Sequence, residues 1–147
     1  MTRQLLYMLG IRSLQLPSSI ASNANITTGG IDAIGFDSTM LVVDIGRPGE
    51  AFGDNRWLKF SFEHSDNNHD YTVISKNLLY SRSALNADNA LVVKQDEATS
   101  QLHTFGYIGA KRYLRATISS SDNHNAPTCV SLWALLGHPS FQSAGPL

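Results

Sequence analysis

The stretch Trp57–His64, WLKFSFEH, alternates apolar and polar side chains from its second residue onward. Its apolar positions, Leu58, Phe60 and Phe62, share one face of an extended chain, and polar side chains occupy most of the other. A period of two residues is typical of a strand with one buried face. Burying the three apolar side chains is worth several kcal/mol, so the segment predicts a strand packed on a hydrophobic core.

The rest of the chain repeats this rhythm, because short apolar runs are separated by Gly, Asn, Asp, Ser or Pro. The other predicted strands are Gly30–Ile34, Thr39–Ile45, Tyr71–Ser75, Ala90–Lys94, Leu102–Tyr107, Arg112–Ser119 and Thr128–Leu136. A helical pattern is weak, and Lys76–Asn86 has room for only a turn or two. The 147 residues suffice for one core. Eight or so strands predict an all-β, single-domain β-sandwich of the jelly-roll type.

Three segments are expected along the chain. Residues 1–25 are predicted to be an extended N-terminal arm, residues 26–137 the sandwich, and residues 138–147 a C-terminal tail. The apolar run from Leu5 to Ile11 is too short and too soon interrupted by Arg12 to favour a cleaved signal peptide. An exposed apolar arm is expected to pack on a neighbouring molecule or back onto the sheet.

Charge and apolar content exclude several classes of function. Eleven Lys and Arg against twelve Asp and Glu give a formal net charge of -1, so the basic excess of a nucleic-acid-binding protein is missing. No apolar run approaches the ~18 residues of a membrane-spanning helix. Cys129, the single cysteine, lies in an apolar stretch and predicts a buried, inert thiol. Trp133 is predicted to lie in the core, and Trp57 to be an exposed anchor.

The motifs that carry chemistry are weak. Asp66–Asp70 begins like a calcium loop, but Tyr71 stands where the turn needs glycine and Asn77 stands where the bidentate glutamate belongs. A polar hairpin tip is therefore favoured. The five histidines lack the helical spacing of a zinc site, and no serine lies in a nucleophile elbow. The sequence predicts no metal, no cofactor and no enzymatic activity.

Three segments between Lys59 and Phe141 carry a family resemblance. They are KFSFEHSDNNHDYTVI (Lys59–Ile74), GYIGAKRYLRATIS (Gly106–Ser119) and SLWALLGHPSF (Ser131–Phe141). In the second segment, Gly106 and Gly109 are expected to supply flexible backbone before a strand. The order of a strand with a polar loop, a Gly-Tyr-x-Gly-x-Lys-Arg-Tyr-x-Arg segment and a closing strand with Gly-His-Pro resembles the capsid cement, or decoration, proteins of tailed phages.

This resemblance implies a jelly-roll sandwich, commonly a homotrimer, that binds the outer surface of the head and bridges subunits of the major capsid protein. It implies assembly in the host cytoplasm, a final place on the capsid exterior, and no direct contact with nucleic acid or membrane. Apolar segments outside the predicted core, exposed aromatic rings and basic side chains are the expected contacts. The predicted contact residues are Arg3, Leu5, Leu6, Tyr7, Trp57, Lys111, Arg112, Arg115, His138, Pro139 and Phe141.

Two other functions stay open from the sequence. A tail or head-completion protein of a phage would assemble as rings or tubes instead of trimers. A carbohydrate-binding sandwich module would need an exposed aromatic platform or a calcium site. Glycan binding that is lost in Trp57→Ala would favour this second alternative.

Overall fold

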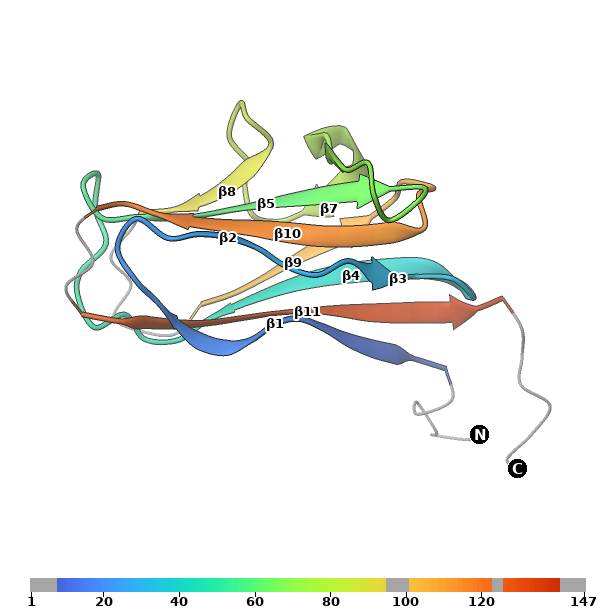
Figure 1. The fold of residues 1–147 in the computed structure, drawn as a ribbon, viewed down its shortest axis with the longest axis horizontal. Coiled ribbons are helices and arrows are strands. Elements are labelled where there is room, and N and C mark those ends of the chain that lie inside the picture. Colours follow the sequence, from blue (N-terminus) through green and yellow to red (C-terminus); the bar gives the residue numbers. More distant parts are fainter. Residues whose placement is uncertain (1–7, 95–100, 123–125, 141–147) are drawn as a thin grey trace.

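The computed structural model describes residues 8–94, 101–122 and 126–140, and these form two antiparallel sheets packed face to face (Figure 1). The five-stranded sheet has the order β1 (Gly10–Ile20), β11 (Thr128–Pro139), β4 (Phe36–Ile45), β9 (Gln101–Tyr107) and β7 (Leu79–Ser81). The six-stranded sheet has the order β2 (Asn25–Thr27), β10 (Tyr113–Ser120), β5 (Leu58–Ser65) and β6 (Thr72–Val73), with β3 (Ile31–Asp32) also on β10 and β8 (Ala90–Val93) also on β5. The predicted all-β sandwich is confirmed.

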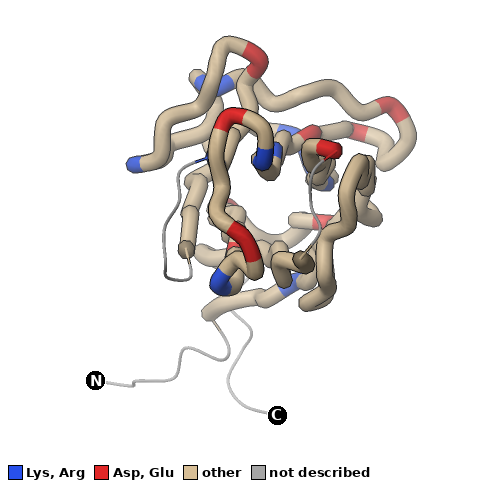
Figure 2. Tube along the Cα trace, turned by 90° about the vertical axis from the view of Figure 1, so that its left-hand side faces the viewer, with Lys and Arg blue, Asp and Glu red and all other residues tan. Residues whose placement is uncertain are grey.

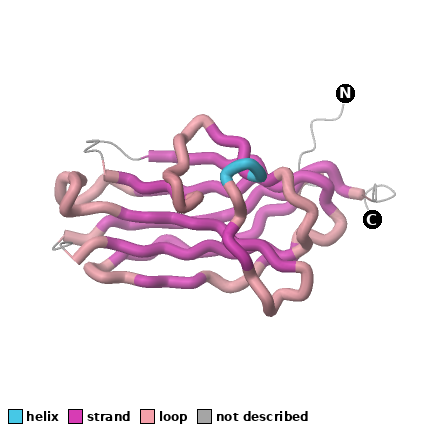
Figure 3. The backbone as a smooth tube through the Cα atoms, turned by 90° about the horizontal axis from the view of Figure 1, so that it is seen from above, coloured by secondary structure: helices cyan, strands magenta, loops and turns pink. Residues whose placement is uncertain are grey.

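The order of pairing follows a jelly-roll path. The first strand, β1, pairs with the last, β11, and the next strands, β2 and β3, pair with β10. Further inward, β4 lies between β11 and β9, while β5 lies beside β10. The chain is thus folded back on itself, and its strands run the length of the molecule with the loops gathered at the two ends (Figure 3).

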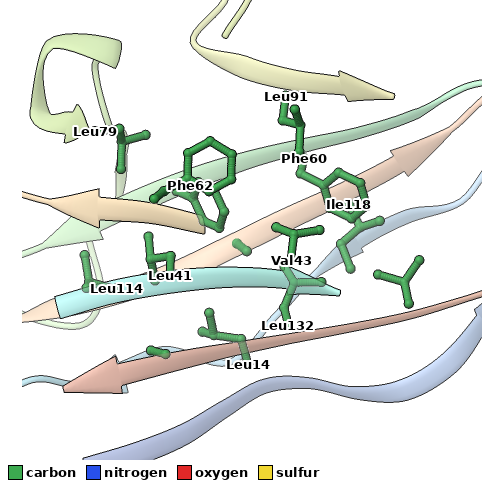
Figure 4. Packing of buried hydrophobic residues seen from close by; sticks show 14 of the residues in the cluster. Leu14, Leu41, Val43, Phe60, Phe62, Leu79, Leu91, Leu114, Ile118 and Leu132 are labelled. Carbon is green, nitrogen blue, oxygen red and sulfur yellow. The ribbon is translucent and has the colours of Figure 1, made fainter. Parts of the chain in front are cut away.

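The core lies between the sheets and is built by the alternation seen in the sequence. Leu58, Phe60 and Phe62 of β5 are almost fully buried, as predicted. The rings of Phe62 and Phe105 meet across the two sheets with centroids 5.2 Å apart. Figure 4 shows the buried apolar side chains of both sheets pointing into one shared interior.

The boundary between the N-terminal arm and the sandwich differs from the predicted one. Residues 1–25 were assigned to an arm, but Gly10–Ile20 form β1, which pairs with β11. The register of this pairing shifts between Ser13 and Gln15 and again between Gln15 and Ser18. Such irregularities interrupt the period of two residues that marks a strand in a sequence. Leu14 and Ile20 are nevertheless buried in the core.

The last strand, β11, also differs from the predictions, both in where it ends and in which side chains it buries. β11 runs to Pro139, so the tail predicted to start at residue 138 begins inside a strand. Its side chains alternate between buried and more exposed positions, which places Cys129 and Trp133 on the outer face of the sheet. The Cys129 thiol is exposed, and Trp133 is only half-buried, whereas both were expected in the interior.

Two local features differ in detail from the predictions. Gly106 is not a hinge before a strand, because it lies within β9 and pairs with both Met40 and Tyr80. The segment predicted to hold a helical turn begins with a 3-10 turn, Lys76–Leu78, and continues as β7. Among the residues described, no helix has the length and apolar character needed to cross a bilayer.

Candidate functional site

An apolar groove lies at the end of the sandwich where the described chain begins and ends. It forms because β1 and β11 run antiparallel, with Gly10 opposite Leu136, and β4 flanks β11 on its other side. The groove has a volume of about 310 Å³. It is lined by Met8, Leu9, Ser38, Thr39, Met40, Leu135, Gly137 and His138. Residues near both ends of the described chain therefore share one surface.

The Gly-His-Pro end of β11 shapes this groove. A Cβ atom on Gly137 would lie 2.9 Å from Ser38 Oγ and 3.6 Å from a methyl carbon of Leu9, so glycine allows both side chains to approach the strand. His138 adopts a left-handed conformation with a φ of 51°, and its Nδ1 shares a 2.8 Å hydrogen bond with Ser38 Oγ. The strand end is thus fixed to β4.

The predicted contacts of the two termini fall partly outside the described residues. Nothing is described for the N-terminal set or for the last aromatic residue of the predicted set. These residues are Arg3, Leu5, Leu6, Tyr7 and Phe141. His138 is exposed and Pro139 is half-buried at the end of β11. Of the predicted terminal contacts, His138 is the one that the structure places in the groove.

The three predicted basic contacts all form ion pairs within the chain. The guanidinium of Arg112 donates to both carboxylate oxygens of Asp32, at 2.8 and 2.7 Å. Its hydrogen bond holds the pKa of the Asp32 carboxyl below its usual value. Lys111 Nζ lies 3.8 Å from a carboxylate oxygen of Asp66.

Arg115 is held between two neighbours on the outer face of the six-stranded sheet. Its Nε donates to Glu63 Oε2 at 2.5 Å, and its guanidinium lies 4.0 Å from the ring centroid of Tyr71. Glu63 and Arg115 are directly opposite each other in the pairing of β5 with β10. Because each basic side chain has an acidic partner in its own chain, an acidic surface of another molecule would have to compete with these pairs.

A buried pair of polar side chains lies beneath Lys111. His64 Nδ1 and Tyr107 Oη are 2.8 Å apart, and the backbone N–H of Lys111 donates to the same Tyr107 oxygen at 3.2 Å. The His64 imidazole and the Tyr107 hydroxyl thus share a buried hydrogen bond, in which the tautomer of the ring decides which group donates. Burial, aided by the positive charge of Lys111, lowers the pKa of His64.

This pair predicts that the free energy of unfolding falls as the pH drops below about 6.5, the usual pKa of histidine. Below this pH the unfolded chain binds a proton at His64 that the folded chain does not bind. The contribution of His64 to the free energy of unfolding is therefore fully present above this pH and decreases below it, by at most about 1.4 kcal/mol per pH unit. Denaturant titrations between pH 7.5 and 5 measure the slope. His64→Gln is expected to flatten it, and His69→Gln, in the exposed loop after the same strand, is the matched control. An equal slope in wild type and His64→Gln would contradict the assignment.

Trp57 lies at the opposite end of the sandwich from the groove. The half-buried ring borders a polar hollow of about 720 Å³ that is also lined by Asn23, Asp54, Asn55, Ser120, Ser121 and Asp122. The backbone N–H of Trp57 donates to Ser121 Oγ at 3.1 Å. This end and the groove cannot act as one small site, because the strands separate them (Figure 3).

The polar loop after β5 is a hairpin tip, as predicted. Asn67 Oδ1 accepts hydrogen bonds from the backbone N–H groups of His69 and Asp70, so the loop is closed by its own side chain. Within the described part of the chain, no three His, Cys, Asp or Glu side chains form a group suited to a metal ion. Positive and negative residues are intermixed over the loops in Figure 2.

The apolar groove is the feature that the sequence did not predict. Its lining comes from β4, from β11 and from the two residues directly before β1, which are far apart in the sequence, and β1 itself was assigned to an arm. One signal was present: Gly137 of Gly-His-Pro lies in an otherwise apolar strand, and a glycine inside a strand is typical of a bulge, a bend or a close approach of other groups.

Two solved structures align with most of this chain. The PBSX exported protein XepA aligns with a TM-score of 0.54 and 16% sequence identity, over 94% of this chain and 42% of that protein. The SPBc2 prophage-derived protein YomS aligns with a TM-score of 0.44 and 13% identity, over 89% of this chain and 96% of that protein. The chain therefore spans less than half the length of XepA, with which it shares a sandwich fold. No protein-family model and no curated protein sequence matches the chain.

Proposed function

We propose that the chain is a structural protein of a tailed-phage particle, and specifically a cement protein that binds the outside of the head and bridges subunits of the major capsid protein. The sequence resemblance from Lys59 to Phe141 motivates this proposal. The likeness to XepA supports only the sandwich fold that the proposal assumes.

One structural observation carries the proposal. The first and last strands lie side by side, so the described chain begins and ends at the same end of the sandwich, beside an apolar groove. Two chain ends that lie at the same end of a rigid body are suited to bind the same neighbouring surface. Several such attachments reinforce one another, because the first contact raises the effective concentration of the next. Three copies, as the resemblance implies, would match a local three-fold axis of the shell.

The energetic role follows from mass action. A protein that binds the expanded, DNA-filled shell more tightly than the empty precursor stabilises the expanded state by the difference in binding free energy. Contacts of shape and charge are enough for this role, and no bond has to be made or broken.

The test uses particles that lack this protein, to which purified chain is added before sedimentation. Full-length chain is expected to sediment with the particles and to raise the temperature at which they release DNA. A variant without residues 1–7 and 141–147 is expected to bind at least about ten-fold more weakly, since it loses contacts worth more than about 1.4 kcal/mol. Asn55→Ala, an exposed position at the opposite end that is not among the predicted contacts, is the matched control. Failure of the full-length chain to bind, or equal binding of the truncated variant, would overturn the proposal.

A further inference from the structure

The polar hollow at the end of the sandwich opposite the groove is built by three chain segments that are far apart in the sequence. Trp57 directly precedes β5, and Ser121 directly follows β10. Because these strands are antiparallel, with Leu58 opposite Ser120, both residues lie at the same end. The turn that contains Asn23 lies there too, since it leads into β2, which pairs with the last residues of β10.

Ser121 holds these segments together. Its backbone N–H donates to the carbonyl of Trp57 at 3.2 Å, and its Oγ accepts from the N–H of Trp57 at 3.1 Å. Its carbonyl accepts from the N–H of Asn23 at 3.0 Å, where the backbone is left-handed with a φ of 53°. The neighbouring Oγ of Ser120, which is also buried, bonds to the backbone of the same turn at two points. The backbone around the hollow is thus fixed before a ligand binds, which lowers the entropic cost of binding.

Trp57 borders two hollows at this end. The larger has a volume of about 720 Å³ and the smaller of about 290 Å³, and both Trp57 and Asp54 line each of them. The larger volume falls within the range of about 300–1,000 Å³ found for ligand-binding clefts. An aromatic ring beside such a space is suited to stack against the C–H face of a sugar ring, because its π face is negative and the C–H groups are slightly positive.

The side chains around the larger hollow can donate and accept hydrogen bonds at several points. Within the described residues, the side chains of Asn23, Asn55 and Asp122 form no hydrogen bond with the protein. An amide both donates and accepts, and a carboxylate accepts at two oxygens, so these groups match the neighbouring hydroxyls of a sugar ring. Trp57 is the one apolar side chain among the described residues that line this hollow. The lining is therefore unsuited to a lipid or an apolar peptide.

The charges select against an anionic ligand. Asp54 and Asp122 are the charged side chains among the described residues that line the larger hollow, and they would repel a phosphate, a sulfate or a uronic acid. Lys59 and Lys94 line the smaller hollow, where Lys94 Nζ lies 3.5 Å from Asp54 Oδ1. This pairing offsets part of the attraction that the carboxylates would have for a cation. The remaining groups of the larger hollow are amides, hydroxyls and an indole, which suit a neutral polar ligand.

We infer that the hollow beside Trp57 is a binding site for a neutral saccharide. The sugar ring stacks on the indole, and its hydroxyls bond to Asn23, Asn55 and Asp122. The sequence leaves carbohydrate binding open only as an alternative to a role in a virion, without a site. The structure adds the place, the contacting groups and the preference for uncharged sugars. The inference does not depend on a role in a phage particle, because the hollow lies at the opposite end from the groove (Figure 3).

The test is an array of neutral and acidic oligosaccharides probed with the purified full chain, followed by titration of the best neutral glycan. Wild-type chain is expected to bind neutral glycans and to leave glycans with carboxylate, sulfate or phosphate groups unbound. Trp57→Ala is expected to weaken binding at least about ten-fold, as at aromatic hot spots. Asn23→Gly removes the amide but allows the left-handed backbone, and is expected to weaken binding about five-fold, the loss of one hydrogen bond. Tyr80→Ala serves as the control, since it removes an exposed aromatic ring from the other sheet.

The outcomes separate this inference from the proposed function, because the array contains no particles. A full chain that binds no neutral glycan would overturn the inference. So would equal binding by wild type and Trp57→Ala while circular dichroism shows both folded, or tighter binding of acidic glycans or of choline, a cation, than of neutral glycans. Glycan binding without particle binding would contradict the proposed function and leave the inference standing, whereas particle binding without glycan binding would do the reverse.

Discussion

Phe62→Ala is expected to lower the free energy of unfolding by about 3–5 kcal/mol. The side chain is buried in β5, and its ring packs against Phe105 of the opposite sheet with centroids 5.2 Å apart. Removing it costs the transfer of the ring to water and leaves a cavity that the two sheets cannot close without losing other contacts. A domain of this size has a total stability of about 5–15 kcal/mol, so the loss would be a large share of it.

Guanidinium titration followed by circular dichroism measures this loss as a shift of the midpoint. Tyr80→Ala is the matched control, since it removes another aromatic ring, but one on the exposed outer face of the five-stranded sheet. Its cost is expected to stay below about 1 kcal/mol at concentrations where the chain is monomeric. Equal costs for the two variants would show that the sheets do not pack through Phe62.

A strand of the sandwich could be predicted from the sequence where it pairs with its neighbour in the sheet in a regular register. β5 and β10 pair at eight consecutive positions, from Leu58 to Ser65, and each shows a clean period of two residues. β1 could not be predicted in this way, because its bulges and Pro17 break the period while its core residues remain buried. The short β2 and β7 offer only three residues each, too few for any period to appear.

The candidate site was harder to predict, because it depends on which strands become neighbours. Arg112 and Asp32 are 80 positions apart in the sequence, and their bidentate pair arises only because β3 lies beside β10. The sequence predicts Lys111, Arg112 and Arg115 as contacts with another molecule, but it does not identify their acidic partners within the chain. Likewise, Cys129 and Trp133 were assigned to the interior, since the continuous apolar run of β11 does not reveal which of its side chains face outward.

Deleting residues 1–20 is expected to remove about 5 kcal/mol of stability, which is close to the whole of it for many domains of this size. The deletion takes away β1, and with it the burial of Leu14 and Ile20, each worth about 1.5–3 kcal/mol. It also exposes the backbone of β11 as a new sheet edge, which favours aggregation. Deleting only residues 1–7 is expected to leave the midpoint of unfolding within about 0.5 kcal/mol of wild type, because β1 stays intact.

A pair of substitutions within β1 separates the role of its core contacts from that of the strand as a whole. Leu14→Ala is expected to cost about 2–5 kcal/mol, while Leu16→Ala, two positions later but 71% exposed, is expected to cost less than about 1 kcal/mol. Thermal unfolding followed by circular dichroism measures both. If the chain without residues 1–20 unfolded cooperatively at the wild-type midpoint, the segment would be an arm after all, and the pairing of β1 with β11 would contribute nothing to the fold. The expected result would show that β1 is part of the folded domain. Any contact that the N-terminus makes with a neighbouring molecule would then be made by the residues before β1.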